Sequence, residues 1–346
     1  MGLRIGVVGL GRIGAFHTGT LAGLPEVDEL VITDAVPAAV DAAAAAFPTA
    51  RAVADIDAVL DADVDAVIVA TATPTHAPFI EKAVAANTPV FCEKPIAMSA
   101  EESADVARRI AGSEVLVAIG YNRRFDPAFS AARAAVASGE LGFITTARST
   151  TLDPAPPPMA YIAGSGGIFR DCAVHDFDTL RWVLDDEVET VFATGTNQGD
   201  PAFSEYDDVD SATAVLTFAS GTMGIVSASR YNGRGYDCRL EVHGSEDSVA
   251  AGWDDGTPMH TTDPAVTFPS GTPHGFFMDR FAEAYRRELT AFCHAVTDDT
   301  PGPVRLCTVD DALAVAVIAD AATLSLTERR PVETAEVDPR LTRTLL

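Results

Sequence analysis

Hydrophobic and polar positions in the first third of the chain alternate in blocks. Short β-branched runs separate alanine-rich segments whose apolar positions recur at helical spacing. This alternation is typical of βαβ units and predicts a parallel sheet with helices between its strands. The predicted strands lie at about residues 5–8, 30–33, 66–70, 89–92 and 115–119.

The pattern changes after Tyr121. A helix at about 127–138, a strand at 144–149, a proline-rich loop at 153–158 and a further helix precede period-two runs at 212–218, 222–229 and 238–243. Such runs predict antiparallel strands with one polar face. Two more helices, at 276–296 and 309–326, follow. We therefore expect an α/β protein with two domains. Residues 1–121 should form an N-terminal Rossmann domain with a doubly wound parallel sheet. Residues 122–346 should form a C-terminal α+β domain with a large, mostly antiparallel open sheet, and its last helix should pack back on the first domain.

Composition narrows the class of protein. The 346 residues are 47% hydrophobic and 21% charged, as in a soluble globular protein, and a net charge of −26 opposes binding to nucleic acid or to anionic membranes. The apolar stretch 312–319 is too short to span a bilayer, and the first residues do not resemble a signal peptide. We expect a cytoplasmic protein with a small-molecule substrate.

The five cysteines lie far apart and form no CxxC pair, which argues against a disulfide framework and against a four-thiolate zinc site. Cys172 and His175 have a spacing that two metal ligands could use, but no second cluster accompanies them. We therefore expect no metal, and a buried free thiol at Cys172.

A glycine motif follows the first predicted strand and opens a helix. Gly9, Gly11 and Gly14, with Arg12 and Ile13 between them, match GxGxxG, and Asp34 ends the next strand. This context predicts a dinucleotide site, with the pyrophosphate at the helix N-terminus and the acid at the adenosine ribose, which favours NAD over NADP. Asp34 could instead be a strand-end turn residue, and Arg12 a solvated one.

Two later strand ends should face the same crevice. Thr73 and His76 follow the fourth strand and are candidates to flank the nicotinamide ribose. In the more ordinary interpretation, Thr75 caps the next helix and His76 lies in its first turn. Glu93 and Lys94 follow the fifth strand. Lys94 is notable because the chain has only two lysines, and lysine is a compact donor whose pKa can be tuned.

A candidate hydride-transfer group lies in the second half. If the chain is helical from about Asp171, then Asp171, His175 and Asp178 share one face, and Asp176 points about 100° away. Alcohol oxidation needs a base for the hydroxyl proton, and histidine suits that role. Lys94 would stabilise the developing alkoxide, and Asp171 would orient the imidazole or hold an adjacent hydroxyl. The alternative is a helix cap at Asp171 and a packed core histidine at 175.

Several motifs together resemble one family, that of glucose–fructose oxidoreductase and inositol dehydrogenase. They are GLGRIG, EKP, YNRRFDP, DPAPPP, YIAGSGGIFRDCAVHDFD, GYDCRLEVHGS and FFMDRFAEAYRRELTAF, in family order over most of the chain. DPAPPP with SGGIFRDxxxHDFD resembles the inositol dehydrogenase branch. The resemblance implies a homo-oligomer, a tetramer or a dimer, assembled through the open sheets.

The resemblance also implies roles for individual residues. Lys94, Asp171 and His175 match the catalytic set, with His175 as the base, and Lys94-Pro95 matches a bond that is cis in relatives. The substrate candidates are Arg124 (or Arg123), Asp153, Asp178 and Tyr236. Leu152 stands where the branch often has Arg, and Cys238 where Gln is frequent, which bears on the choice of polyol.

The function expected from the sequence is NAD-dependent oxidation of a ring hydroxyl of myo-inositol to a keto-inositol. Two other functions remain open: a dehydrogenase of another cyclitol or sugar on the same fold, and a non-catalytic NAD-binding regulator.

Overall fold

The computed structural model describes residues 2–297 and 304–342, which form two compact units. The first unit comprises Met1–Phe125 and Glu283–Leu313, and the second comprises Asp126–Ala282 and Ala314–Leu346. The sequence predicted one boundary, after residue 121. The structure instead places Glu283–Leu313, expected in the second domain, with the first unit.

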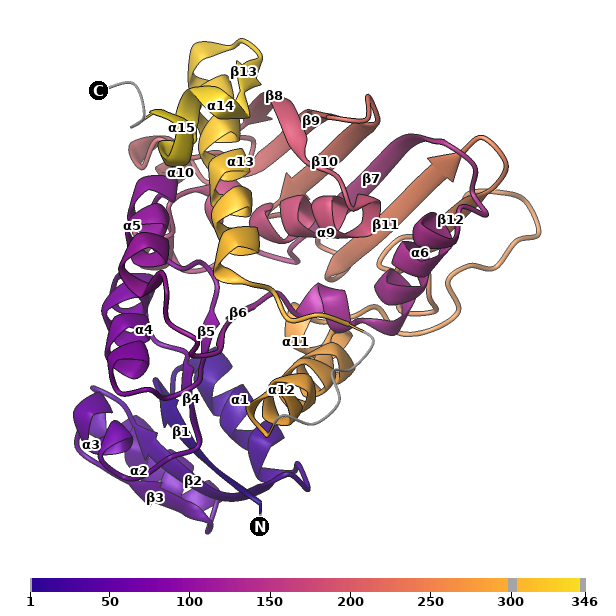
Figure 1. Ribbon diagram of the computed structural model, residues 1–346. Helices are drawn as coiled ribbons and strands as arrows, with labels where there is room; N and C mark the ends of the chain where they lie inside the picture. The colour runs from indigo at the N-terminus through magenta and orange to yellow at the C-terminus, as the bar shows by residue number, and fades with distance from the viewer. Residues whose placement is uncertain (1, 298–303, 343–346) are drawn as a thin grey trace. The chain divides into compact units, whose positions relative to one another are not determined.

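The first unit is built on a parallel sheet of six strands in the order β3-β2-β1-β4-β5-β6 (Figure 1). This is the strand order of a dinucleotide-binding Rossmann sheet, and it confirms the predicted fold. The strands are β1 (Leu3–Val8), β2 (Val27–Thr33), β3 (Ala50–Ala52), β4 (Ala66–Val69), β5 (Val90–Glu93) and β6 (Val117–Gly120).

Helices connect these strands, as the alternating pattern predicted. They are α1 (Arg12–Ala22), α2 (Pro37–Ala46), α3 (Ile56–Leu60), the 3₁₀ helix η1 (Thr73–Thr75), α4 (His76–Ala85), α5 (Ala100–Ile110) and the 3₁₀ helix η2 (Asn122–Phe125). The central strands are buried on both faces: all four residues of β4 and of β5 are buried. Burial on both faces explains why these strands are continuous apolar runs rather than alternating ones.

Helix α12 (Ala282–Val296) explains the difference in the domain boundary. Its Leu289, Phe292 and Cys293 are fully buried in the hydrophobic core of the first unit, together with residues of β1, β2 and β4. Their spacing of three and four residues gives α12 one apolar stripe. Which sheet such a stripe covers is not encoded in its spacing, and here it covers the first one.

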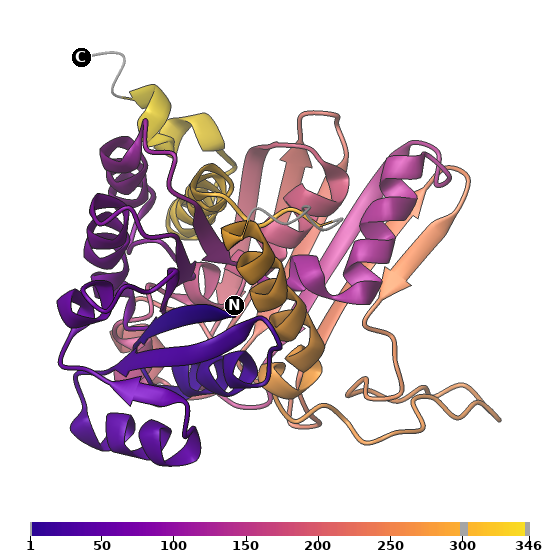
Figure 2. The ribbon, with the colours of Figure 1, turned by 60° about the horizontal axis from the view of Figure 1, so that its bottom comes forward.

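The second unit is built on a mixed sheet of seven strands in the order β12-β11-β7-β10-β9-β8-β13 (Figure 2). Only β7 and β10 pair in parallel among its described strands, so the predicted, mostly antiparallel sheet is confirmed. The strands are β7 (Ile144–Leu152), β8 (Val188–Thr196), β9 (Ser211–Phe218), β10 (Met223–Ser229), β11 (Asp237–Gly244), β12 (Ser248–Ala251) and β13 (Val332–Glu333).

Helices α6 (Pro127–Ser138) and α9 (Val174–Leu184) pack against each other and against β12 and β7, respectively (Figure 1). Asp126 caps α6 by accepting hydrogen bonds from the backbone N–H groups of Ala128 and Phe129, and it pairs with Arg280 at 2.8 Å. The remaining helices are α7 (Met159–Ile162), α8 (Ile168–Asp171), α10 (Ala202–Glu205), α11 (Phe277–Arg280), α13 (Val309–Glu328), α14 (Thr334–Val337) and α15 (Pro339–Thr342).

Two predicted helices differ from the observed ones. The helix expected at 276–296 is divided into α11 and α12 at Phe281, whose side chain is buried against Phe129 of α6 and Tyr236. The helix expected to run on from Asp171 is also interrupted: α8 ends at Asp171, and α9 begins at Val174 after a turn at Cys172 and Ala173.

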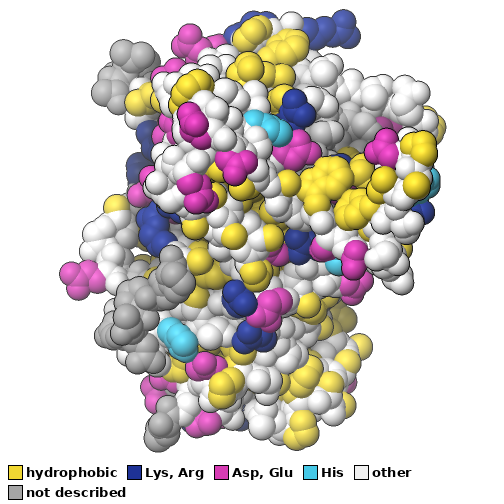
Figure 3. Space-filling view, turned by 90° about the vertical axis from the view of Figure 1, so that its right-hand side faces the viewer, with side chains coloured by type: hydrophobic (Ala, Val, Ile, Leu, Met, Phe, Trp, Pro, Cys, Tyr) yellow, Lys and Arg dark blue, Asp and Glu magenta, His cyan; other side chains and the backbone are white. Residues whose placement is uncertain are grey.

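Several surface charges form ion pairs with opposite charges, although acidic residues outnumber basic ones by 50 to 24. Glu29 binds Arg4, Glu283 binds both Arg286 and Arg287, and Arg330 binds Glu336. On the face in Figure 3, acidic and basic side chains lie among one another rather than in separate patches. No helix within the described part of the chain is both long enough and apolar enough to cross a membrane.

Candidate active site

The three glycines of the loop after β1 differ in what a side chain at each position would meet. Gly9 has φ of 95°, and a Cβ there would lie 2.6 Å from the Ala70 carbonyl oxygen, while a Cβ at Gly14 would overlap the carbonyl oxygen of Gly9. By contrast, no described atom lies within 4 Å of a Cβ at Gly11. Gly9 and Gly14 therefore make the turn and the close packing possible, and the open space lies at Gly11, where a pyrophosphate approaches in such loops.

Helix α1 presents its N-terminus at this open space. Its N-cap is Gly11, whose lack of a side chain leaves the first-turn N–H groups without a side-chain cap, and no acidic residue occupies the first turn. Arg12 is exposed and Ile13 half-buried there. A helix N-terminus with this arrangement suits an anionic group. The loop therefore fits the pyrophosphate of a dinucleotide.

Asp34 lies directly after β2 and faces the same loop. The backbone N–H of Leu10 donates to Asp34 Oδ2 at 2.5 Å, and the N–H of Val36 donates to Oδ1 at 2.7 Å. Asp34 is thus a strand-end turn residue, as the plainer interpretation held. It is also half-exposed, and its oxygens have lone pairs left for ribose hydroxyls. The two interpretations are compatible.

His76 braces two loops of the first unit. Its Nδ1 lies 2.7 Å from the Pro95 carbonyl oxygen and its Nε2 3.0 Å from that of Thr71, and the residue is 1% exposed. Burial lowers the pKa of His76, although both carbonyls oppose that effect. The ring therefore ties the loop after β4 to the loop after β5. Thr73, in η1, remains half-exposed beside it.

Glu93 and Lys94 occupy the end of β5. Glu93 Oε1 lies 2.6 Å from Nε2 of His17, a fully buried residue of α1, and Glu93 Oε2 accepts the backbone N–H of Lys94 at 3.3 Å. Lys94 is half-buried, and the Lys94-Pro95 peptide is cis. His17 is a residue that the sequence interpretation missed. Its position three residues after Gly14, on the helix that opens the dinucleotide site, was the available signal.

Arg124 is placed inside the first unit. It lies in η2, is 2% exposed, and pairs with Asp311 of α13 at 3.2 Å. Burial alone would raise the pKa of Asp311, but Arg124 and hydrogen bonds from Thr308 lower it overall. The neighbouring Arg123 is also buried.

In the second unit, Asp171 and His175 lie on either side of the turn that separates α8 from α9. Asp171 is the last residue of α8, and its Oδ1 accepts a hydrogen bond from the Tyr161 hydroxyl at 2.8 Å. His175 is half-buried in the first turn of α9, and Asp178 is 1% exposed one turn later. The single helical stripe expected from the sequence is therefore wrong at Asp171, because the chain turns before α9 begins.

Asp176, expected only to point away from the face of His175 and Asp178, contacts the sheet. Its Oδ1 accepts hydrogen bonds from the hydroxyls of Ser149 at 2.5 Å and Thr151 at 2.9 Å, both on β7. These bonds fix the first turn of α9 on the sheet, and so fix the position of the neighbouring His175.

Arg230 is the second residue that the sequence interpretation missed. It follows β10, its side chain is 3% exposed, and its two terminal nitrogens approach two predicted site residues: Nη2 lies 2.8 Å from Asp171 Oδ2, and Nη1 lies 3.4 Å from Asp153 Oδ2. The structure thus brings Asp153 and Asp171 together although 18 positions separate them in the chain. A buried arginine beside two acids leaves no periodic signal in a sequence.

Tyr236 lies just before β11. It is 3% exposed and packs edge-on against Phe277 and Phe281, and its backbone N–H donates to the His274 carbonyl at 2.8 Å. Gly235 has φ of 151°, and a Cβ there would lie 2.6 Å from the same carbonyl oxygen. The GY pair therefore fixes the entry to β11.

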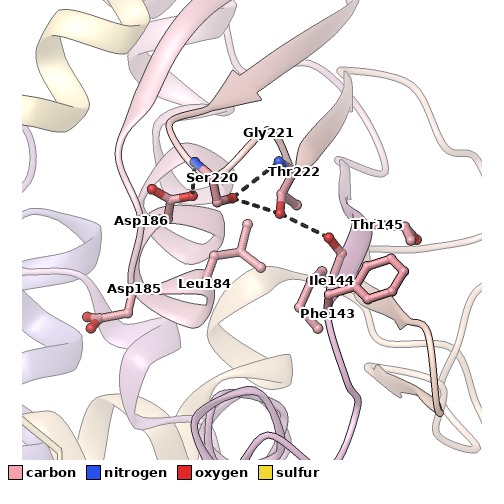
Figure 4. A pocket seen from close by; sticks show the side chains of 9 residues that line it. All are labelled: Phe143, Ile144, Thr145, Leu184, Asp185, Asp186, Ser220, Gly221 and Thr222. Carbon is pink, nitrogen blue, oxygen red and sulfur yellow. Dashed lines mark hydrogen bonds between the residues drawn. The ribbon is translucent and has the colours of Figure 1, made fainter.

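A separate depression of about 690 Å³ lies at the opposite end of β7 and β10 from Asp153 and Arg230 (Figure 4). It is formed by the start of β7, the turn between β9 and β10 and the end of α9. Its lining residues are Phe143, Ile144, Thr145, Leu184, Asp185, Asp186, Ser220, Gly221 and Thr222. None of the predicted site residues lines it. The Ser220 hydroxyl donates to the Thr222 hydroxyl, which in turn donates to the Ile144 carbonyl.

The parallel sheet and its glycine loop define the class of protein, one that binds a dinucleotide. Comparison with known families gives the same class and a narrower group. Residues 3–121 match the oxidoreductase family with an NAD-binding Rossmann fold, and residues 129–250 match the GFO/IDH/MocA C-terminal domain. The chain belongs to the GFO/IDH/MocA family and is an NAD-dependent dehydrogenase that acts on a CH–OH group.

Individual relatives are similar over nearly the whole chain. The inositol 2-dehydrogenase of Rhizobium meliloti is 39% identical over 345 residues, covering 97% of this chain and 100% of the relative. The myo-inositol 2-dehydrogenase of Thermotoga maritima is 35% identical, covering 97% and 99%. The crystal structure of scyllo-inositol dehydrogenase from Lactobacillus casei with NAD(H) and scyllo-inositol has a TM-score of 0.86 at 27% identity, covering 97% and 100%.

Proposed function

We propose that this protein oxidises a secondary ring hydroxyl of an inositol, with myo-inositol as the first substrate to test, and that it forms a keto-inositol. The observation that carries the proposal is the pair of carboxylates at Asp153 and Asp171, held together on Arg230 in the second unit. A polyol offers many hydroxyl donors, and ionised carboxylates are strong acceptors for them. The full-length similarity to inositol dehydrogenases supports the same substrate class.

In the proposed mechanism, His175 removes the hydroxyl proton of the ring, because an imidazole titrates near neutral pH. A bound NAD would supply the acceptor for the hydride that leaves the carbon of that hydroxyl. Lys94 donates a hydrogen bond to the oxygen as it gains negative charge, and Asp171 accepts a hydrogen bond from the imidazole or from a neighbouring hydroxyl. Asp153, Asp178 and Tyr236 bind the other hydroxyls.

The first unit holds the cofactor in this proposal. Gly9, Gly11 and Gly14 receive the pyrophosphate with the first turn of α1, where Arg12 and Ile13 lie, and Asp34 receives the adenosine ribose. Thr73, Glu93 and Lys94 line the nicotinamide end. We assign His76 to holding the loops after β4 and β5, and Arg124 to holding η2 through Asp311, since both are almost fully buried and already bonded.

The experiment assays the purified protein with NAD and, in turn, myo-inositol, scyllo-inositol and glucose. The absorbance of NADH measures turnover. We expect NADH from an inositol and little or none from glucose. NADH from glucose alone would favour the second candidate, a sugar dehydrogenase. The observation behind this candidate is that Leu152 and Cys238 differ from the residues frequent in the inositol dehydrogenase branch. NAD binding without turnover of any of the three substrates would contradict the proposed substrate class.

We further propose that the protein is a homo-oligomer, a tetramer or a dimer, that assembles through the open face of the second sheet. Phe192, Val215 and Ile225 lie directly opposite one another on β8, β9 and β10, and Phe192 and Val215 are 42% and 40% exposed. Residues paired across strands share a face, so these side chains form one apolar row.

We place the protein in the cytoplasm. All five cysteines are free and buried, which suits a reducing compartment, and NAD-dependent chemistry suits the same place.

A further inference from the structure

Arg230 is a buried arginine whose role is identified neither by the sequence motifs nor by the family match. Residues Ser229 and Leu152 are opposite each other at the ends of the parallel strands β10 and β7, and the backbone N–H of Asp153 donates to the Ser229 carbonyl at 2.8 Å. Parallel strands end at the same edge of a sheet, so Arg230 and Asp153 are placed side by side by the register itself. The backbone N–H of Arg230 is anchored on the Asp210 carbonyl at 2.7 Å.

Asp171 reaches the same guanidinium from a different element. It ends α8, and its two oxygens have different partners: Oδ1 accepts from the Tyr161 hydroxyl, and Oδ2 lies 2.8 Å from Arg230 Nη2. The side chains of Asp171 and Asp153 are 11% and 16% exposed. Each carboxylate oxygen has more than one lone pair, so both acids keep acceptor capacity toward a ligand.

The electrostatics explain why an arginine is needed here. Burial alone would lower the pKa of Arg230, but the charges of Asp171 and Asp153 raise it above its ordinary value. Burial raises the pKa of the neighbouring Cys172 thiol well above its ordinary value, with Asp153 and Asp176 adding to the effect. The thiol is therefore neutral, and one permanent cation faces the two carboxylates Asp153 and Asp171.

We propose that Arg230 is a positioning residue for the polyol: it holds Asp153 and Asp171 side by side as charged acceptors, so that both bind hydroxyls of one ring. Two carboxylates on the two terminal nitrogens of one planar guanidinium have a fixed spacing, whereas a lysine ammonium is a single point charge without that fork. Arg230 thereby sets which arrangement of hydroxyls is accepted. This inference rests on the proposed polyol dehydrogenase function.

The test compares Arg230→Lys and Arg230→Gln with wild type, using myo-inositol and scyllo-inositol as substrates. We expect Arg230→Lys to raise KM for the preferred inositol about 10-fold or more, with the Kd for NAD within about twofold of wild type, because the cofactor loop belongs to the first unit. We expect Arg230→Gln to lower kcat/KM about 100-fold, and to move the acidic limb of its pH profile to higher pH, because two carboxylates without a cation favour uptake of a proton.

Arg234→Gln is the matched control. Arg234 is exposed on the same connection between β10 and β11, so the same loss of charge should leave kcat/KM within about twofold. Removing one partner of a buried ion pair also reduces stability, so each variant is first checked by its thermal transition with NAD. If Arg230→Gln does not fold, Arg230→Lys and the charge-balanced double variant Asp153→Asn/Arg230→Gln, which we expect to fold with a raised KM, decide the question.

The outcomes separate the inference from the proposed function. No turnover of any inositol by the wild-type protein overturns the proposed function and, with it, the inference. Turnover by wild type, with folded variants that are less stable but have unchanged KM and pH profile, overturns only the inference and leaves Arg230 a purely structural residue.

Discussion

Lys94 is one of only two lysines in the chain, and the other provides its control. We expect Lys94→Ala to keep the Kd for NAD within a few-fold and to lower kcat/KM by about 10²–10⁴, because the side chain acts on the reacting oxygen rather than on the cofactor's phosphates. Lys82→Ala should change neither value, since Lys82 of α4 forms an exposed ion pair with Asp57 of α3. Steady-state kinetics and NAD titration measure both. Unchanged turnover in Lys94→Ala would remove Lys94 from the mechanism.

His17 is expected to stabilise the first unit through its hydrogen bond with Glu93. The pair is buried, and its hydrogen bond of 2.6 Å joins α1 to the end of β5. We expect His17→Ala to lower the free energy of unfolding by about 1–3 kcal/mol, because Glu93 would be left buried without its partner. Urea denaturation measures the loss. His17→Gln retains a donor and should recover part of it, and equal stability of all three proteins would show that the bond contributes nothing.

At the scale of the element, the glycine loop allows a paired prediction. Gly11→Ala adds a methyl group where no described atom lies within 4 Å, so the thermal transition without NAD should stay near that of wild type while NAD binding weakens. Gly14→Ala places the methyl group against the Gly9 carbonyl, so it should lower the transition temperature as well. Thermal unfolding and NAD titration separate the two. Equal NAD affinity of Gly11→Ala and wild type would contradict the proposal that the pyrophosphate binds at Gly11.

Helix α12 is also tested as an element. Leu289 is fully buried in the core of the first unit, so Leu289→Ala should cost about 2–5 kcal/mol in the free energy of unfolding. Arg287→Ala, on the exposed side of the same helix, removes only a surface ion pair with Glu283 and should cost less than about 1 kcal/mol. Chemical denaturation compares them. Equal effects would mean that α12 is not part of the core.

At the scale of the whole molecule, the exposed apolar row on the second sheet is the testable feature. We expect Val215→Asp to dissociate the oligomer, because charges would then be buried in the interface on the open face. Light scattering after size-exclusion chromatography gives the mass. Val36→Asp, at a residue 57% exposed in the first unit, is the control that should leave the mass unchanged. A wild-type monomer would contradict the proposed assembly.

The sequence by itself determined the features that depend on neighbours along the chain. The alternation of apolar runs predicted the Rossmann sheet, the period-two runs predicted strands of the second sheet, and GxGxxG with Asp34 predicted the NAD site, because turns, strand periodicity and helix starts are local properties. Lys94 was identified by its scarcity and by EKP, whereas Asp171 and His175 depended on a family motif.

The tertiary structure decided what depends on distant parts of the chain. It assigned α12 to the first sheet, interrupted the helix at Asp171, and brought His17 to Glu93 and Arg230 to Asp153 and Asp171. The partners in these contacts are separated by 76, 77 and 59 residues. No periodicity spans such separations, because the strand register and helix packing that close them exist only once the chain has folded.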